Sequence, residues 1–283
     1  MKIKKVGVVG CGQMGGGIVQ VCAQSGYEVV VSEINDGLLK KGLASINAIL
    51  TRNVEKEKIT PQDKDAVLGR IQGTTSMRDF SDRDLVIEAA VENMDLKKKI
   101  FAELDKICPP QAILATNTSC LSIINIASMT GRPEKVLGLH FFNPVPIMKL
   151  LEIVRTIATS EETLETGKEF GRTLDKTIVI AKDTPGFIVN RLLAPYLFNA
   201  ARMLEYGVAT REDIDTGITL GLNHPIGPLS LLDLIGLDTM LFIGDAIYDE
   251  FKDPQYAAPT LLRKMVTRGW LGRKTKKGFY EYK

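Results

Sequence analysis

The sequence lacks a strong excess of charge of either sign, with 36 lysines and arginines against 34 aspartates and glutamates and a formal net charge of +2. Proteins dedicated to nucleic acids or anionic membranes usually carry a marked basic excess. Long apolar runs are also missing, because none approaches the roughly 18 consecutive residues that a membrane-spanning helix requires. We therefore expect no nucleic-acid partner and no membrane-embedded segment.

Cysteine and histidine are scarce, with four and two copies. Cys11, Cys22, Cys108 and Cys120 form no CxxC pair, and no histidine cluster completes a zinc ligand set. Neither a metal site nor a disulfide framework is expected. Few, scattered cysteines are typical of a reducing compartment, and the N-terminal residues do not resemble a cleavable signal peptide. These features favour a cytoplasmic protein.

Short apolar runs alternate with helical patterns over the first two thirds of the chain, as in an α/β domain with a mostly parallel sheet. These runs occupy residues 6–10, 28–33, 84–89, 112–116, 135–140, 151–154 and 177–180. After Pro185 and Gly186 only helical patterns follow, and a chain of this length is expected to form about two domains. We predict an α/β domain over residues 1–184 and an all-helical domain over residues 185–283.

The segment 34–69 predicts a pair of helices inserted into the α/β domain. Its charges of both signs are interleaved, as on a solvated helical hairpin, and such an insertion could be structural decoration alone.

In the second domain, helices are predicted over residues 187–206, 211–220, 229–249 and 259–268. Thr210 and Ser230 are predicted to cap two of them.

A glycine-rich motif follows the first predicted strand and precedes an apolar helical stretch. The GxGxxG motif is Gly10-Cys11-Gly12-Gln13-Met14-Gly15. In this context it predicts a Rossmann-type fold, in which the glycines permit a tight turn and close approach of a pyrophosphate to a helix N-terminus. The alternative is that the glycines serve only a turn. Glu33, at the end of the second strand, can accept hydrogen bonds from a ribose and would repel a 2′-phosphate, which favours NAD over NADP.

The two histidines, His140 and His224, lie in different surroundings. His140 ends an apolar strand, at the edge of the sheet where such folds bind ligands. Glu152 interrupts the next apolar run, and a buried carboxylate needs a partner. From the pattern alone, a structural buried pair and a catalytic dyad are equally open.

Other polar residues are expected near the same edge of the sheet. They are Asn117, Thr118 and Ser119 after the fourth run, and Asn143 just beyond His140. Ser119 can donate to a ligand carbonyl, although residues 117–119 could instead only cap the next helix. Asn190 begins the helical domain and would face the cleft, or else form an interhelical hydrogen bond.

Together these motifs resemble the short-chain L-3-hydroxyacyl-CoA dehydrogenases, especially the bacterial 3-hydroxybutyryl-CoA dehydrogenases, over essentially the whole chain. The matching segments are residues 10–15, 88–93, 117–119, 138–144, Glu152 and 183–191. The resemblance implies that His140 is the general acid/base oriented by Glu152, and that Ser119 and Asn190 contact substrate. It also implies cofactor contacts for Glu92, Lys97 and Lys274, to which we add Asn117, Ser119 and Asn143.

The resemblance further implies that the inserted helical pair receives the CoA moiety, for which Ser45, Arg52 and Lys56 are the candidate contacts. The expected activity is reversible NAD-dependent oxidation of an (S)-3-hydroxyacyl-CoA, with 3-hydroxybutyryl-CoA as the favoured substrate and acetoacetyl-CoA as its product. A homodimer through the helical domain is expected, using the apolar runs 228–232 and 240–243. Two alternatives remain open: a related hydroxy-acid or hydroxy-sugar dehydrogenase that does not use CoA, and a non-catalytic NAD(H)-binding protein.

Overall fold

The computed structural model describes residues 2–283, which divide into two compact units at the Asp183–Thr184 bond. The first unit contains an eight-stranded sheet with the order β3-β2-β1-β4-β5-β6-β7-β8. Its strands are β1 Lys5–Val9, β2 Glu28–Ser32, β3 Ile71–Thr74, β4 Leu85–Glu88, β5 Ile113–Thr116, β6 Val136–Phe141, β7 Leu150–Arg155 and β8 Thr177–Lys182. Every neighbouring pair is parallel except β6 and β7, which run antiparallel. The predicted mostly parallel α/β fold is confirmed.

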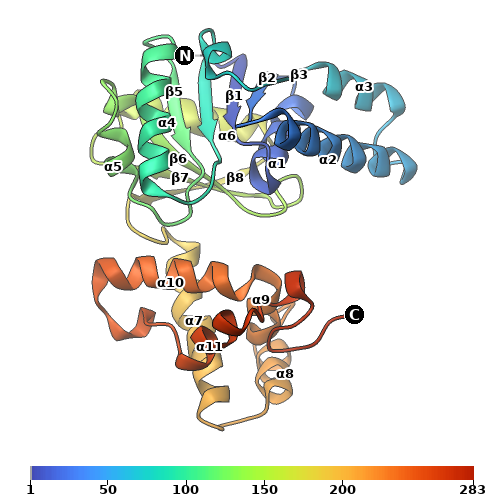
Figure 1. Ribbon diagram of the computed structural model, residues 1–283, viewed down its shortest axis with the longest axis vertical. Coiled ribbons are helices and arrows are strands. Elements are labelled where there is room, and N and C mark those ends of the chain that lie inside the picture. Colours follow the sequence, from blue (N-terminus) through green and yellow to red (C-terminus); the bar gives the residue numbers. More distant parts are fainter. Residues whose placement is uncertain (1) are drawn as a thin grey trace. The chain divides into compact units, whose positions relative to one another are not determined.

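Helices cover this sheet and extend beyond it. They are α1 Gln13–Gln24, α2 Asp36–Glu55, α3 Pro61–Gly69, α4 Met94–Ile107, α5 Ile123–Ala127 and α6 Glu161–Thr173, with the 3-10 turns η1 Met77–Phe80 and η2 Pro133–Lys135. The predicted helical pair is confirmed as α2 and α3, which pack against each other and extend outward beyond β3 (Figure 1). The Asn35 side chain caps α2, and Thr60 with Asp63 forms a capping box on α3.

The sheet has a hydrophobic layer on each face. One layer joins the strands to α1 and α6, through Ile18 and Phe170 among others. Successive side chains of a strand point to opposite faces. Val86 and Leu114 lie outside this cluster and are nevertheless fully buried, so they belong to the other face. Burial on both faces explains why most strands were recognisable as continuous apolar runs.

The second unit is helical, as predicted. Its helices are α7 Val189–Glu205, α8 Arg211–Gly221, α9 Pro228–Ile235, α10 Leu237–Phe251 and α11 Thr260–Arg268, with the turns η3 Pro254–Tyr256 and η4 Arg273–Thr275. The single helix predicted over 229–249 is wrong, because Gly236 has φ +104° and separates α9 from α10. This backbone conformation lies outside the α-helical region and is available mainly to glycine.

The two predicted caps have different outcomes. Thr210 caps α8, because its hydroxyl accepts a hydrogen bond from the Asp213 amide. Ser230 is not a cap, since it lies inside α9. Its amide and that of Leu229 instead donate to the carboxylate of Asp215 on α8, so the cap comes from a residue distant in sequence. Among residues 2–283, no helix is both long enough and apolar enough to cross a membrane.

Candidate active site

The glycine-rich segment gives each glycine a separate structural role. Gly10 has φ +96°, and a Cβ there would lie 2.8 Å from the Ala89 carbonyl oxygen. A Cβ at Gly15 would overlap the Gly10 carbonyl oxygen, so only glycine lets α1 approach the turn this closely. Gly12 is the N-cap of α1, and a Cβ there would meet nothing within 4 Å. The three environments are those of a pyrophosphate loop: a tight turn, an open approach and a close helix contact.

The remaining residues of this loop are Cys11, Gln13 and Met14, the last two being the first residues of α1. Glu33, directly after β2, accepts a hydrogen bond from the Cys11 amide at 2.7 Å and another from the Ile34 amide at 3.1 Å. A carboxylate therefore lies beside the loop on the β2 side. An NAD ribose would meet acceptors there, and a 2′-phosphate would meet a like charge.

His140 and Glu152 occupy opposite positions in the antiparallel pairing of β6 with β7. Their atoms Nδ1 and Oε2 are 2.6 Å apart, and the exposed fractions of the two residues are 4% and 0%. An ionised carboxylate only accepts hydrogen bonds, so the hydrogen on His140 lies on Nδ1 when the ring is neutral. Nε2 then has a lone pair for a proton. The hydroxyl oxygen of Ser119 lies 3.2 Å from Nε2.

The segment after β5 packs against β6. The Asn117 side-chain oxygen accepts a hydrogen bond from the Phe141 amide at 2.9 Å. Residues 117–119 do not cap α5, because the Ile123 and Ile124 amides donate to the carboxylate of Asp183 instead. The capping alternative for this segment is therefore wrong, and Ser119 lies beside His140.

Two glutamates and a lysine support this segment from the neighbouring strand and helix. The Glu92 carboxylate accepts hydrogen bonds from the Ser119 amide, at 2.9 Å, and from the Thr118 hydroxyl. Lys97 is fully buried, and its ammonium lies 3.2 Å from Glu92 and 2.7 Å from Glu88. Direct contact of Glu92 and Lys97 with a cofactor stays a prediction.

The predicted CoA contacts share one exposed face of α2 and its C-terminal cap. Ser45, Arg52 and Lys56 lie seven and four residues apart, a spacing that places side chains on the same side of a helix. Asn143, in the exposed connection after β6, is also on the surface. These placements are compatible with ligand contacts and do not test them.

Asn190 and Lys274 belong to the second unit. Asn190 lies in α7 and is buried, with 8% of its surface exposed. Lys274 forms an ion pair with Asp238 at the start of α10. Their predicted roles at the substrate and cofactor remain predictions.

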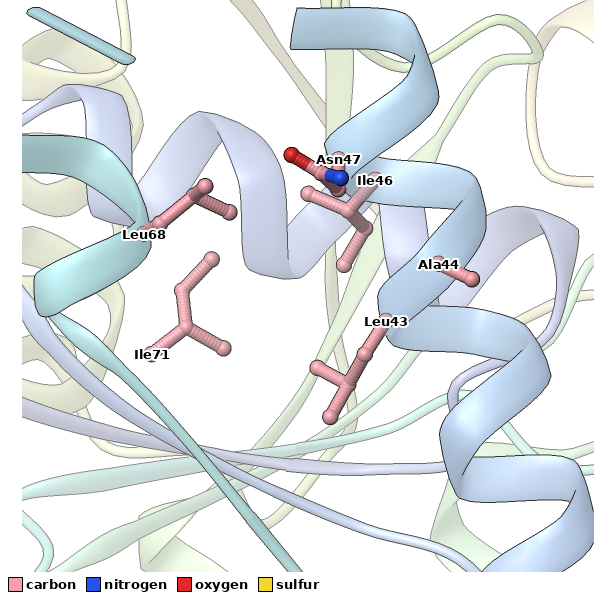
Figure 2. Close-up of a pocket in the computed structure, with 6 residues that line it drawn as sticks. All are labelled: Leu43, Ala44, Ile46, Asn47, Leu68 and Ile71. Carbon is pink, nitrogen blue, oxygen red and sulfur yellow. The ribbon is translucent and has the colours of Figure 1, made fainter. Parts of the chain in front are cut away.

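A separate pocket of about 360 Å³ lies between α2, α3 and the start of β3 (Figure 2). Leu68 and Ile71 line one side, opposite a wall contributed by α2 (Figure 2). That wall consists of Leu43, Ala44, Ile46 and Asn47. The lining carries no charged side chain, so this pocket does not suit a polyanion. It is distinct from the face of α2 that carries Arg52.

Sequence reasoning missed Glu88 and Thr116, which are fully buried beside the candidate site. The sequence did contain a signal for Glu88. It is a carboxylate at the end of an apolar strand, just as Glu152 is a carboxylate within one. Lys176 was also missed. Its ammonium donates to the carbonyls of Val145 and Met148, both at 2.7 Å, in the connection that follows His140. A lysine between a helix and a strand carries no such signal.

A proton acceptor at the same edge of the sheet as a dinucleotide loop is suited to alcohol oxidation, in which a hydroxyl proton and a hydride leave together. The first unit thus has the parts of an NAD-dependent dehydrogenase. Within residues 2–283, no three His, Cys, Asp or Glu side chains are grouped as a metal site would require.

Comparison with known proteins gives the family. The model of the 3-hydroxyacyl-CoA dehydrogenase NAD binding domain matches residues 5–184, and that of the 3-hydroxyacyl-CoA dehydrogenase C-terminal domain matches residues 186–282. The chain belongs to the 3-hydroxyacyl-CoA dehydrogenase family and is an NAD-dependent dehydrogenase.

Three relatives show how far the similarity extends. The 3-hydroxybutyryl-CoA dehydrogenase of Mycobacterium tuberculosis is 49% identical over 282 residues, 99% of each chain. The protein of the same name from Clostridioides difficile is 48% identical over 278 residues, 98% of this chain and 99% of its own. The crystal structure of (S)-3-hydroxybutyryl-CoA dehydrogenase PaaH1 from Ralstonia eutropha has a TM-score of 0.96 and 47% identity, covering 100% of both chains.

Proposed function

We propose that the protein oxidises (S)-3-hydroxybutyryl-CoA reversibly to acetoacetyl-CoA, with NAD as the redox partner. The observation that carries this proposal is the His140–Glu152 pair with Ser119 beside it, at the carboxyl edge of the sheet that also contains the glycine loop. The family and the names of the relatives supply the substrate class.

In this mechanism His140 Nε2 accepts the proton of the substrate hydroxyl. Bound NAD would supply the hydride-accepting chemistry that oxidation at C3 requires. The Glu152 carboxylate stabilises the imidazolium that forms and keeps the ring oriented. The Ser119 hydroxyl, 3.2 Å from Nε2, orients the C3 oxygen by hydrogen bonding. Asn190 is proposed to orient the thioester carbonyl, and Asn117, Asn143 and Lys274 to contact the cofactor.

The loop residues Gly10, Gly12 and Gly15 are proposed to bind the cofactor pyrophosphate, and Glu33 its adenosine ribose. The absence of a Cβ at Gly12 leaves room for this approach. We further propose that Ser45, Arg52 and Lys56 bind the phosphates of CoA. All three are solvent-exposed, and two are cations suited to a phosphate ligand.

The test is the initial rate of NADH absorbance loss with acetoacetyl-CoA, run beside free acetoacetate and beside NADPH. The proposal expects rapid loss only with the thioester and NADH together. Equal rates with free acetoacetate would favour a dehydrogenase that does not use CoA. NADH binding without reduction of either substrate would favour the non-catalytic alternative.

We also propose a homodimer formed by the helical unit. The runs 228–232 and 240–243, expected to supply its interface, are partly buried, and Phe242 among them is exposed. Leu229, Leu232, Met240 and Ile243 are buried within the single chain. Apolar side chains elsewhere in this unit are exposed, including Leu192, Tyr206, Val208, Leu220 and Leu222. A contiguous patch of exposed apolar groups is typical of an interface, and these side chains are the proposed contributors to one. A single monomeric mass across dilution in light scattering would contradict a dimer.

The proposed cellular location is the cytoplasm. All four cysteines are buried free thiols, and free thiols are the rule in a reducing compartment. Fractionation of the source cells followed by immunodetection would test this location, and recovery outside the cytoplasm would overturn it.

A further inference from the structure

A buried ion pair lies outside the His140–Glu152 dyad, where β4 ends and α4 begins. Glu88 is the last residue of β4, and Lys97 lies in the first turn of α4. Both residues are 0% exposed, and their charged atoms are 2.7 Å apart. Removing two charges from water is costly, and an apolar pair of similar volume is often as stable. Stability alone therefore gives a weak reason for this pair.

The Lys97 ammonium lies among three oxygens of the chain. Nζ lies 2.7 Å from Glu88 Oε1, 3.2 Å from Glu92 Oε2 and 3.4 Å from the Ala90 carbonyl oxygen. An ammonium has three hydrogens to donate. Lys97 thus joins the carboxylates of Glu88 and Glu92.

Glu88 is likewise fully engaged. Its Oε1 accepts from Lys97 and from the Ala90 amide at 2.7 Å. Its Oε2 accepts from the hydroxyl of Thr116, the last residue of β5, at 2.7 Å. Glu88 therefore joins three neighbouring segments: the end of β4, the start of α4 and the end of β5.

The network continues to the reacting group. Glu92, whose second oxygen contacts Lys97, accepts a hydrogen bond from the Ser119 amide at 2.9 Å. The Ser119 hydroxyl oxygen is in turn 3.2 Å from His140 Nε2. An unbroken series of polar contacts thus leads from Glu88 through Lys97, Glu92 and Ser119 to His140.

We propose that Glu88 is a positioning residue of the dehydrogenase: through Lys97 it fixes the Glu92 carboxylate, and thereby places Ser119 opposite His140. This inference rests on the roles proposed above for Ser119 and His140. Lys97 connects the two carboxylates in this arrangement. Misplacement of a catalytic group by about 1 Å can reduce a rate by about 100-fold.

The test is the Glu88→Gln variant, assayed with acetoacetyl-CoA and NADH beside the unaltered protein. We expect kcat to fall by about 10-fold to 100-fold, with KM for the thioester changed by less than about threefold because the contacts proposed for the CoA moiety remain. The matched control is Asp105→Asn, which weakens the Arg132–Asp105 ion pair, 2.7 Å long, at the other end of α4. The control should retain kcat within about twofold.

A second variant separates positioning from folding stability. Glu88→Gln with Lys97→Met removes both charges, and an uncharged pair is often as stable as the ion pair. We expect the double variant to regain thermal stability relative to Glu88→Gln alone without regaining kcat. Recovery of kcat together with stability would mean that the pair is merely structural, and would overturn the inference.

The failures can be told apart. An inactive unaltered protein would overturn the proposed function and this inference together, whereas unchanged kcat in folded Glu88→Gln would overturn the inference alone. If Glu88→Gln does not fold, Thr116→Val is the second test, because it removes the hydroxyl that donates to Glu88 at 2.7 Å and accepts from the Thr118 amide at 3.2 Å. The expected result is a severalfold lower kcat, and unchanged kcat would contradict the positioning role.

Discussion

At the scale of single residues, the tautomer of His140 determines what the site can do. Nδ1 faces Glu152 and Nε2 faces Ser119, so the nitrogen that can exchange a proton is directed at a hydroxyl. No single element produces this arrangement, since His140 lies on β6, Glu152 on β7 and Ser119 in the segment after β5. It needs a carboxylate on one side of the ring and a polar segment on the other.

Replacing His140 by alanine removes the proposed proton acceptor. We expect kcat to fall by about 100-fold to 10,000-fold, the usual contribution of general acid/base catalysis, while the affinity for NADH is unchanged. Stopped-flow or steady-state rates with acetoacetyl-CoA and NADH fluorescence titration measure the two quantities. His224→Ala is the matched control, because His224 is exposed in the helical unit. Parallel losses of turnover and NADH affinity would count against the assigned role.

Single residues also show where sequence reasoning stops. The Glu152 partner could be inferred because a carboxylate in an apolar strand needs a neutralising group and the sequence has few histidines. The same reasoning flags Glu88 but cannot name Lys97, since three lysines, Lys97, Lys98 and Lys99, stand in a row at the start of α4. Only the rotation of that helix about its axis decides which lysine is buried.

At the scale of elements, α2 packs directly against the glycine loop. A Cβ at Gly42 of α2 would lie 2.8 Å from the Cys11 Cβ and closer still to its sulfur and carbonyl oxygen. The helix proposed to bind CoA and the loop proposed to bind the NAD pyrophosphate are therefore in contact.

Gly42→Ala tests this contact. We expect a loss of about 1–3 kcal/mol in the free energy of unfolding, because the added methyl group meets backbone that cannot move freely, together with weaker NADH binding. Urea unfolding and NADH titration provide the measurements. The matched control, Gly217→Ala, adds a methyl group in open space inside α8 and should stabilise by about 0.4–1 kcal/mol. If Gly42→Ala changed neither the free energy of unfolding nor the NADH affinity, the helix would be able to shift away from the loop without consequence.

Helices and strands were predicted well where a local sequence pattern determines their bounds, and poorly where tertiary structure determines them. Parallel strands buried on both faces stand out as apolar runs, whereas β3, Ile71–Thr74, was missed because this edge strand is short and only half buried. The break at Gly236 was missed because a lone glycine in an apolar helical pattern does not reveal its φ. Ser230 looked like a cap, but Asp215 supplies the carboxylate.

At the scale of the whole molecule, the buried thiols are expected to lower the free energy of unfolding at alkaline pH. Burial raises the pKa of the Cys11 and Cys108 thiols from 9.0 to about 11, and it raises the pKa of the Cys22 and Cys120 thiols further. A raised folded-state pKa contributes stability that is complete below the unfolded value and is lost as the pH rises toward the folded value. Each thiol should therefore reduce stability above about pH 9, at a rate approaching about 1.4 kcal/mol per pH unit.

Urea unfolding midpoints measured at about pH 8 and about pH 10 check this expectation. The urea midpoint should be lower at the higher pH. Cys108→Ala should show a smaller decrease than the unaltered protein, because one titrating thiol is gone. Equal falls in the two proteins would assign the alkaline loss to other groups.

The division into two units was evident from the change in sequence pattern near Pro185, since strands and helices have different periodicities. The relation between a residue of one unit and a ligand on the other has no such pattern. Lys274 accordingly entered the candidate site through family resemblance alone, and the sequence left Asn190 equally able to form an interhelical hydrogen bond. His140, Glu152 and Glu33 could be identified from local sequence context.

The antiparallel register of β6 and β7 makes the proposed catalytic pair accessible to measurement without any substrate. His140 and Glu152 are opposite each other because Gly138 is opposite Val154 and Phe141 is opposite Leu151. Opening of this ladder would separate the imidazole from its carboxylate, and the same opening would expose backbone amides to deuterium. Amide hydrogen exchange in these two strands therefore reports the ladder openings that would separate the pair.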